Sequence, residues 1–394
     1  MEWVNTEGRI PIKSWCADVD ESTMRQANNL ANLPFAFRHV ALMPDGHFGY
    51  GMPIGGVLAT LGVVIPNCVG VDIGCGMSFV STNVPAEAAT AELRKAWTHS
   101  VKRDVPVGFN HHRTEQDWPG FADMPDCIPS SIHGKAAYQL GTLGGGNHFI
   151  ELQKNDEGKL CIMVHSGSRN FGYRLAKRYN DIAKDLCDRW YSPIPTKGED
   201  GLAFLPMETD EAKEYFTVMN YALEFAFESR KRMLEAASSA LVHLLPAENA
   251  GVSFGEMINI HHNFAAWEHH YGKNIIVHRK GATQAKKGQL GIIPGSMGTS
   301  SYIVRGLGNK ESFESCSHGA GRVMGRGDAN RKLTMDAVKD AMGDIVFEIG
   351  KSRGGKPDLS EAPQAYKDID AVIAAESDLV EVVTKLSPLA VVKG

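Results

Sequence analysis

Runs of apolar and β-branched residues separated by glycine predict a sheet whose strands come from distant parts of the chain. Residues 54–80 contain two such runs, IGGVLATLGVVIP and VGVDIGCGMSFV, and this composition is typical of strands joined by tight turns. Shorter runs of the same kind lie at 159–165, 274–279 and 302–305. Each of these four segments is therefore expected to contribute one or more strands.

Two longer segments predict helices instead. Residues 210–245 lack proline and glycine, carry an apolar stripe and begin with acidic residues, which favour the positive end of a helix dipole. Residues 192–209 are expected to form a loop, either a lid over a site or a surface excursion. In residues 171–190 apolar side chains recur every three or four positions, at Leu175, Tyr179, Ile182, Leu186 and Trp190.

The order of these elements predicts the fold class. Strands and helices do not alternate as βαβ units, so an α+β fold with mixed or antiparallel sheets and peripheral helices is favoured over a Rossmann or P-loop fold. The chain has no internal repeat, low-complexity tract or Pro/Ser/Gly-rich linker, which predicts a single domain over residues 1–394. No run of about 18 apolar residues indicates a membrane span, and residues 1–15 do not resemble a signal peptide. We therefore expect a cytoplasmic protein.

Composition narrows the set of partners and cofactors. The chain has 41 Lys and Arg and 46 Asp and Glu, which gives a formal net charge of −5. A polyanionic partner is therefore expected to bind through a local basic patch and not through the overall charge of the protein. The basic stretch 279–287 (RKGATQAKK) is a candidate for phosphate contacts and equally for a solvated loop. Seven scattered cysteines without a CxxC pair argue against a disulfide framework or a four-cysteine zinc module. The chain also lacks the GxxxxGK[ST], KxDG, HExxH and GxSxG motifs.

Residues suited to metal binding are concentrated in five glycine-rich segments. Singly, Cys75 is typical of a small core residue, and pairs such as His111-His112 and His269-His270 are typical of solvated surface. Together, a carboxylate, a thiol and several imidazoles at element ends favour a transition-metal site whose thiolate bridges two ions. The fourth segment is also expected to open a helix. The segments are 71–76 (VDIGCG), 144–149 (GGGNHF), 164–169 (VHSGSR), 260–264 (IHHNF) and 316–322 (CSHGAGR).

Nine segments taken together resemble the RtcB-type RNA ligases, in matching order from about Pro34 to Gly394. They are VDIGCG, GTLGGGNHFIE, VHSGSR, HHN, GIIPGSMG, SYIVRGLG, CSHGAGR, AYKDID and a terminal VVKG. The resemblance implies an RtcB-like fold and an enzyme that joins an RNA 3′-phosphate or 2′,3′-cyclic phosphate to a 5′-hydroxyl, using GTP and two Mn²⁺ ions, in tRNA splicing or RNA repair. It leaves room for an activating partner of the archease type, and we expect a monomer.

The resemblance also assigns roles to individual residues. Asp72, Cys75 and His148 would hold one Mn²⁺, while Cys75, His165 and His262 would hold the second. His318 would attack the α-phosphorus of GTP and become guanylylated. Asp45, Arg169 and Arg322 would lie near the RNA phosphates. The guanosine pocket would be formed by Asn147, His148, Phe149, Glu151, His262, Asn263, Pro294, Gly295, Ser296, Met297, Ser301, His318, Gly319, Ala320, Gly321 and Lys393.

The chemistry of these residue types agrees with the implied roles. Neutral imidazole is a competent nucleophile near neutral pH because its unperturbed pKa is about 6.5. Arginine forks suit phosphate oxygens. A carboxylate such as that of Glu151 accepts hydrogen bonds from the N1 and N2 edge of guanine, which adenine lacks.

Two positions depart from the family pattern. Gly46 stands where the family usually has valine, which should loosen that loop, and Gly325 stands where many members have serine. Both departures affect the expected substrate preference rather than the ligands or the nucleophile. Two alternatives remain open: a metal-dependent phosphoesterase that hydrolyses cyclic phosphates without ligation, and a non-catalytic protein that binds RNA ends.

Overall fold

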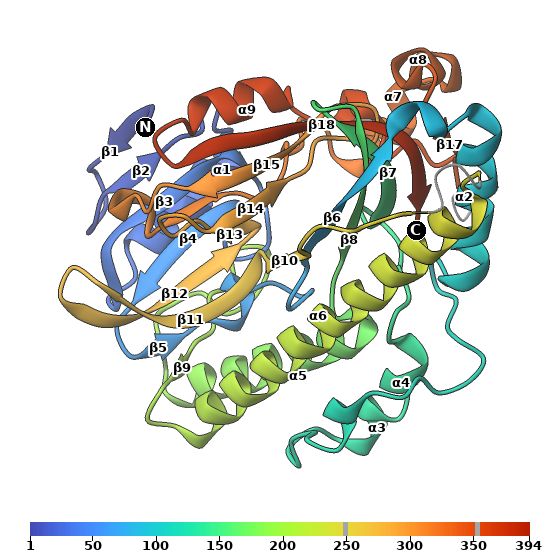
Figure 1. Ribbon diagram of the computed structural model, residues 1–394. Coiled ribbons are helices and arrows are strands. Elements are labelled where there is room, and N and C mark those ends of the chain that lie inside the picture. The colour runs from blue at the N-terminus through green and yellow to red at the C-terminus, as the bar shows by residue number, and fades with distance from the viewer. Residues whose placement is uncertain (247–250, 351–354) are drawn as a thin grey trace.

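Two large sheets form the centre of the molecule in a computed structural model that describes residues 1–246, 251–350 and 355–394. In Figure 1 the strands of both sheets run across the middle of the molecule. The six-stranded sheet has the order β1 (Trp3–Asn5), β2 (Ile12–Ser14), β3 (Ala36–His47), β4 (Ile54–Thr60), β12 (Lys273–Lys280) and β11 (Asn263–His270).

The second sheet has eight strands and supplies most of the candidate site. Strand β17 (Val346–Phe347) lies parallel to β18 at the side of the main path. Two small ribbons pair β13 (Ala282–Gln284) with β16 (Ser315–Ser317), and β5 (Val63–Val64) with β9 (Leu205–Pro206). The path of the large sheet is β10 (Ile258–His261), β6 (Gly76–Pro85), β8 (Lys159–Ser166), β7 (Phe149–Asn155), β18 (Val380–Lys393), β15 (Ser301–Gly306) and β14 (Leu290–Ile293).

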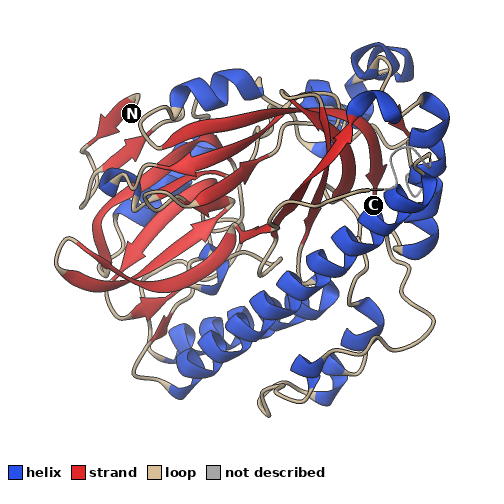
Figure 2. Ribbon diagram, in the orientation of Figure 1, coloured by secondary structure: helices blue, strands red, loops and turns tan. Residues whose placement is uncertain are grey.

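Helices cover the outside of the sheets, as Figure 2 shows. The α-helices are α1 (Glu21–Ala31), α2 (Ala91–Asp104), α3 (Ser130–His133), α4 (Ala136–Gln139), α5 (Arg169–Arg189), α6 (Asp210–Leu244), α7 (Arg326–Lys332), α8 (Met335–Met342) and α9 (Ile369–Ala375). Short 3₁₀ turns lie at η1 (Pro66–Cys68), η2 (Ala86–Ala88), η3 (Pro119–Phe121), η5 (Lys310–Ser312) and η6 (Pro363–Ala365). None of the helices in the described part of the chain is long and apolar enough to cross a membrane.

Helix α6 is the long support beneath the eight-stranded sheet. Its first turn is capped by Thr209, whose side chain accepts from the N–H of Ala212, and acidic residues follow. One end of its apolar face packs with α5 around Tyr179 and Phe225. The other end packs with α2 and the sheet around Trp97 and Leu241. The helix therefore contributes its buried face to two separate core clusters, one at each of its ends.

The α+β class is confirmed, with mostly antiparallel strands, a parallel β2–β3 pair and nothing Rossmann-like. The helices predicted at 171–190 and 210–245 are α5 and α6, displaced by at most two residues. Residues 54–80 contain β4, β5 and part of β6, and 192–209 is a loop apart from β9.

The expectation that residues 260–264 open a helix is wrong. The segment contains the end of β10 and the start of β11, and only His262 lies between these strands. Strand β10 pairs with β6 in one sheet, and β11 pairs with β12 in the other. Pairing with distant strands therefore decides the local conformation, which the local sequence could not show.

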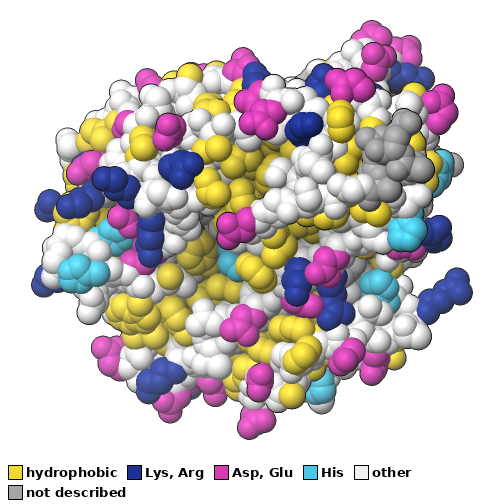
Figure 3. Space-filling view, in the orientation of Figure 1, with side chains coloured by type: hydrophobic (Ala, Val, Ile, Leu, Met, Phe, Trp, Pro, Cys, Tyr) yellow, Lys and Arg dark blue, Asp and Glu magenta, His cyan; other side chains and the backbone are white. Residues whose placement is uncertain are grey.

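Charged side chains of both signs are interspersed over the face shown in Figure 3. Hydrophobic side chains gather there in a hollow above α6, where a groove of about 450 Å³ is lined by residues of α6, β10 and β11. This distribution agrees with the net charge of −5, since no broad basic field is present on that face.

Candidate active site

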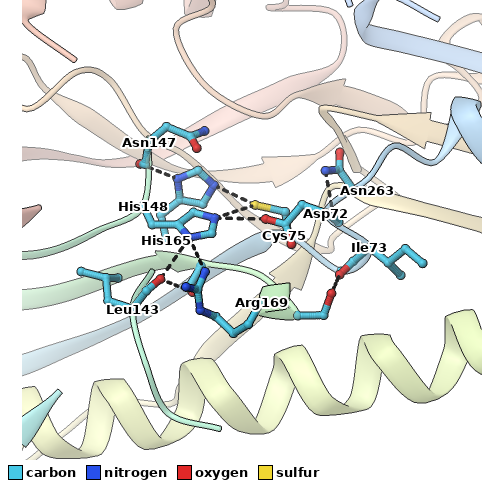
Figure 4. A network of polar contacts seen from close by, with 12 residues as sticks. Asp72, Ile73, Cys75, Leu143, Asn147, His148, His165, Arg169 and Asn263 are labelled. Atoms are coloured by element: carbon cyan, nitrogen blue, oxygen red, sulfur yellow. Dashed lines mark hydrogen bonds and ion pairs between the residues drawn. The ribbon is translucent and has the colours of Figure 1, made fainter. Parts of the chain in front are cut away.

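Three side chains from three neighbouring strands meet at one end of the eight-stranded sheet. Cys75 directly precedes β6, His148 directly precedes β7, and His165 lies near the end of β8. The strand register places Met77 and Phe149 on either side of His165. Figure 4 shows the side chains converging on the sulfur. The Sγ atom of Cys75 lies 3.3 Å from Nε2 of His165 and 3.5 Å from Nε2 of His148.

Backbone carbonyls orient both imidazole rings. Nδ1 of His148 donates to the carbonyl of Leu143 at 3.0 Å, and Nδ1 of His165 donates to the carbonyl of Asn147 at 3.2 Å. A carbonyl only accepts, so Nδ1 of each ring carries a proton and Nε2 is the nitrogen that faces the cluster. This second layer of hydrogen bonds is typical of histidines that bind metal ions.

Asp72 and His262 complete a set of five potential ligands. Oδ2 of Asp72 lies 3.1 Å from Nε2 of His148, and the buried Oδ1 of Asp72 has no hydrogen-bond partner among the described residues. The backbone N–H of His262 donates to the carbonyl of Cys75 at 2.9 Å, and its buried Nδ1 also lacks a partner. Buried polar atoms are normally satisfied, so these two orphaned atoms fit a bound cation.

Burial sets the protonation of this cluster. Desolvation lowers the pKa of His165 and of His262 well below the usual range, and neighbouring histidines lower both further. Burial also raises the pKa of the Cys75 thiol, and the Asp72 carboxylate raises it further. The rings of His165 and His262 are therefore neutral and able to donate lone pairs, while the thiolate form of Cys75 requires a nearby cation.

His318 lies next to this cluster. Its ring centroid is 4.8 Å from that of His262, which in turn is 5.2 Å from that of His165. Nδ1 of His318 donates to Oδ2 of Asp45 at 2.6 Å, and the backbone N–H of His318 donates to the same oxygen at 3.1 Å. Nε2 of His318 is therefore the nitrogen whose lone pair is available.

Asp45, which was predicted to lie near the RNA phosphates, contacts His318. Its side chain is fully buried, and it is held against His318 from β3 of the six-stranded sheet. Gly321 and Gly55 both have positive φ angles and pack closely against Asp45. A Cβ atom at Gly321 would lie 2.5 Å from the carbonyl oxygen of Asp45. These glycines allow the backbone to approach, so Asp45 is placed to orient the histidine.

Several residues predicted for a guanosine pocket lie together along β7, β15 and β18. Gln153 donates to Oε2 of Glu151 at 2.7 Å and to the hydroxyl of Ser301 at 3.4 Å. Nζ of Lys393 lies over the ring of Phe149, 5.7 Å from its centroid. Burial raises the pKa of the Glu151 carboxyl to about 8, although Lys393 opposes the shift.

The loops after β14 and β16 approach each other at the same place. The N–H of Gly295 donates to the hydroxyl of Ser301 at 3.2 Å. A Cβ atom on Gly319 would lie 3.3 Å from the carbonyl oxygen of Pro294. Ser296 and Met297 follow Gly295 and are buried, as is Ala320 after Gly319. The predicted segments 294–297 and 318–321 are therefore neighbours in space.

Two residues predicted to contact ligands, Asn263 and Arg322, form hydrogen bonds within the protein itself. The amide of Asn263 donates to the carbonyl of Asp72 at 3.1 Å and accepts from the N–H of Gly281 at 2.8 Å. Arg322 pairs with Glu361 at 3.2 Å and donates to the hydroxyl of Tyr366 at 3.1 Å. Asn263 thus supports the turn that carries Asp72, and Arg322 braces the loop after His318.

Arg169 lies between the cluster and the surface. It is the first residue of α5 and has a φ angle of 59°. Its Nη1 lies 3.3 Å from Nδ1 of His148, and a Cβ on Gly144 would overlap its guanidinium. The predicted position near phosphates is compatible with this placement beside a ligand ring, and glycine at 144 makes the placement possible.

The basic stretch 279–287 is not one continuous surface. Arg279 is fully buried and pairs with Glu268, and Lys280 is buried and donates to the carbonyl of Asn67 at 3.1 Å. Lys286 and Lys287 are exposed. A phosphate-contacting role over the whole stretch is therefore wrong for its first two residues, which stabilise the fold.

The two departures from the family pattern have local explanations. Gly46 is a buried residue of β3, and its carbonyl accepts from Lys367 at 3.1 Å. The expectation of a loosened loop there is wrong, because position 46 belongs to a strand. Gly325 is the N-cap of α7, without a side chain to cap the helix. Serine at that position would supply a capping oxygen.

Two supporting residues were missed by sequence reasoning. Arg230 of α6 is fully buried and donates to the carbonyls of Gly74 at 2.7 Å and Ser166 at 3.0 Å, which flank the metal cluster. Lys367 donates to the carbonyls of Pro44 and Gly46, on both sides of Asp45, at 3.1 Å each. The sequence contained a signal for Arg230, because a positively charged residue at this position interrupts the apolar stripe of α6.

Comparison with known proteins finds one family along nearly the whole chain. The family model described as tRNA-splicing ligase RtcB matches residues 26–125 and 120–394. The RNA-splicing ligase RtcB of Escherichia coli (strain K12) is 38% identical over 418 residues, covering 100% of this chain and 99% of the relative. The tRNA-splicing ligase RtcB of Thermococcus kodakarensis is 29% identical over 445 residues, covering 95% and 91%. The RNA-splicing ligase RtcB of Mycobacterium tuberculosis is 30% identical over 441 residues, covering 94% and 100%.

Proposed function

This chain belongs to the tRNA-splicing ligase RtcB family, and from that premise we propose that it is an RNA ligase. It joins an RNA 3′-phosphate, or a 2′,3′-cyclic phosphate after hydrolysis, to a 5′-hydroxyl end, in tRNA splicing or RNA repair. Relatives named RNA-splicing ligases in bacteria and archaea match almost their full length, which supports the ligase activity.

The observation that carries the mechanism is the pairing of His318 with Asp45. The carboxylate fixes the proton on Nδ1 and leaves Nε2 as the nucleophile. As Nε2 attacks the α-phosphorus of GTP, the ring becomes positively charged, and the buried carboxylate 2.6 Å away stabilises that charge. The ring of His318 also lies beside the ring of His262, one of the predicted ligands, so the nucleophile is next to the ligand cluster.

The ligand set fits two cations. Asp72, Cys75 and His148 would hold one Mn²⁺, and Cys75, His165 and His262 would hold a second through the shared sulfur. Nitrogen, sulfur and oxygen donors of this kind suit first-row transition metals. Bound there, the ions would neutralise phosphate charge and stabilise the attacking and leaving groups of an in-line displacement.

The reaction has three transfers. Nε2 of His318 forms a bond to the α-phosphorus of GTP, and the bond to the β-phosphate oxygen breaks, releasing pyrophosphate. An oxygen of the RNA 3′-phosphate then attacks the same phosphorus, and the P–N bond breaks, which returns the electron pair to His318 and leaves an RNA-3′-pp-G end. Finally the 5′-hydroxyl oxygen attacks the RNA phosphorus, loses its proton and displaces GMP.

Selection of guanine is assigned to Glu151. A guanine presents two N–H donors on one edge, and these would compensate the cost of burying the ionised carboxyl. Ser301 and Lys393 lie beside it, and Phe149 forms an apolar wall under Lys393. Adenine lacks this pair of donors, so ATP should not replace GTP.

Guanylylation of His318 is the direct test. Protein incubated with α-labelled GTP and Mn²⁺ should form an acid-labile adduct with GMP, as expected for a P–N bond. His318→Ala should form none, whereas His269→Ala, which changes an exposed histidine of β11, should match the wild type. An equal adduct in His318→Ala would disprove the assignment of the nucleophile.

A ligation assay with defined RNA ends separates the alternatives. A phosphoesterase would open a cyclic phosphate without GTP and form no joined product, and a binding protein would show no turnover. Joining that requires GTP and is lost in His318→Ala supports the ligase. A monomeric state, a cytoplasmic location and an activating partner of the archease type stay predictions.

A further inference from the structure

The segment 106–113, which leads from α2 toward α3 in Figure 1, packs against the loop that carries His148. The N–H of Gly108 donates to the carbonyl of Gly144 at 2.8 Å, and the N–H of Leu143 donates to the carbonyl of Pro106 at 2.9 Å. Val107 and Gly144 also form a parallel bridge. The segment is therefore tied to the ligand loop by its backbone.

Arg169 connects this segment to the ligand cluster itself. Its Nη2 donates to the carbonyl of Gly108 at 3.5 Å, and its Nη1 lies 3.3 Å from Nδ1 of His148. One guanidinium thus contacts both the segment and a predicted metal ligand. Residues of the segment that point outward consequently lie at the rim of the proposed active site.

Phe109 points into solvent from that rim. Its side chain is 95% exposed, more than any other large apolar side chain within the described ranges. Asn110 holds the turn that presents it, because its N–H and its side-chain amide donate to the carbonyl of Val107 at 3.2 Å and 3.0 Å. A single exposed phenyl ring is common on protein surfaces. Its fixed place beside the ligand loop is the informative feature.

The surroundings of Phe109 provide positive charge and accessible backbone. Gly145 and Gly146 are the exposed residues of the ligand loop, and a Cβ atom on Gly145 would lie 3.9 Å from Cα of Gly108. A Cβ atom on Gly146 would lie 3.4 Å from Nη2 of Arg326, whose side chain is 56% exposed and pairs with Glu361 through Nε at 3.0 Å. Arg113 is exposed on the same segment as Phe109. An aromatic platform with neighbouring cations is how proteins hold single-stranded nucleic acid.

We propose that Phe109 stacks on a base of the RNA strand that enters the active site, while Arg326 and Arg113 contact its phosphates. The inference rests on the proposed function, because it supplies the substrate-holding part of the same site. Every base has a stacking face, so this contact holds an RNA end without selecting its sequence.

The test compares RNA affinity among variants of the full chain without GTP. Two probes are used, each a labelled single-stranded RNA of about ten nucleotides, since sites of this type cover roughly 4–16 nucleotides. One probe carries a 3′-phosphate, and the other carries a 5′-hydroxyl. Phe109→Ala should weaken binding of at least one probe by roughly 5- to 150-fold, the equivalent of losing one stacked base. Phe109→Tyr should bind within about twofold of the wild type, because it keeps the ring.

Tyr191→Ala is the matched control. Tyr191 is 92% exposed and follows α5 at the end opposite Arg169, about 30 Å away along a helix of this length. Its removal should leave both affinities unchanged. An equal loss in Tyr191→Ala, or no loss in Phe109→Ala with either probe, would overturn the proposal.

An abasic probe and a guanylylation assay complete the test. Removing the terminal bases of the affected probe should weaken wild-type binding to the level of Phe109→Ala and should leave Phe109→Ala unchanged. Guanylylation without RNA should be equal in Phe109→Ala and wild type. If the wild type ligates RNA and Phe109→Ala binds RNA equally well, only this inference fails. If the wild type neither binds nor joins RNA, the proposed function fails and this inference fails with it.

Discussion

The carboxylate of Asp45 accepts two hydrogen bonds from His318, one from Nδ1 at 2.6 Å and one from the backbone N–H at 3.1 Å. The two residues are 273 positions apart in the sequence and come from different parts of the fold. The pair fixes both the orientation and the tautomer of the ring. Everything proposed for the nucleophile depends on this arrangement.

Replacing Asp45 by asparagine should slow guanylylation by about hundredfold or more. The amide cannot stabilise a positively charged ring, and its NH₂ group would favour the wrong tautomer by donating to Nδ1. The measurement is the rate of adduct formation from α-labelled GTP, with GTP affinity measured in parallel. Asp370→Asn, a change at an exposed ion pair with Lys385, should not alter the rate. A normal rate in Asp45→Asn would rule out the orienting role.

Lys367→Met should lower the maximal rate of guanylylation without weakening GTP binding. The change removes the donor that holds the carbonyls of Pro44 and Gly46, so the carboxylate between them is no longer fixed. Tenfold is the expected order, since about 1.4 kcal/mol of positioning is lost with the hydrogen bonds. Lys385→Met, an exposed control, should match the wild type. A change confined to KM for GTP would contradict this role.

Added Mn²⁺ should raise the melting temperature, and a chelator should reverse the effect. Binding to the native state alone stabilises it by about 2.7 kcal/mol when the free ion is at a hundred times its Kd. Cys75→Ser should lose most of this response because the shared sulfur is gone. Cys161→Ser tests an equally buried cysteine of β8 outside the cluster and should keep the response. The prediction is wrong if both variants respond alike.

Arg230→Met should destabilise the protein by about 2–4 kcal/mol, because buried carbonyls near the cluster lose a charged donor. It should also weaken Mn²⁺ binding roughly 10- to 100-fold, as expected for a group that supports metal ligands. Arg232→Met removes a partly exposed pair with Glu228 on the same helix and should cost about 1 kcal/mol or less. Urea unfolding and metal titration measure the two effects, and equal stability of both variants would refute the first.

Gly46→Val should destabilise this protein although the family usually has valine there. A Cβ atom at position 46 would lie 3.1 Å from the carbonyl oxygen of Met43 and 3.7 Å from Sγ of Cys16, the atom that alanine lacks. Overpacking of this kind costs about 1–3 kcal/mol. Cys16→Ala in the same chain should recover part of the loss by making room. Thermal unfolding of the single and double variants would show no such recovery if the two positions were independent.

The sequence predicts an element best when the pattern of residues within that element decides its conformation. Helices α5 and α6 follow from the spacing of their apolar residues, and the strands of 54–80 follow from their composition. Conformation set by distant partners was not accessible in this way. The 260–264 segment was misassigned because its strands are defined by pairing with β6 and β12, which no local pattern reveals.

The candidate site shows the same division. The glycine-rich segments identified Cys75, His148 and His165, whose convergence follows from strand register. The partners of Asp45 and Arg322 could not be predicted, because such buried polar contacts join segments that are close only in the folded chain. Arg230 was open to prediction, since burying a charge in an apolar helix face requires a reason.

His262 is the single residue between β10 and β11, and those strands belong to different sheets. An ion bound by both His262 and His165 would therefore connect the junction of the two sheets to β8, a strand inside the eight-stranded sheet. Loading the ion should stiffen both sheets together, so amide exchange in β8 and β11 should slow in concert.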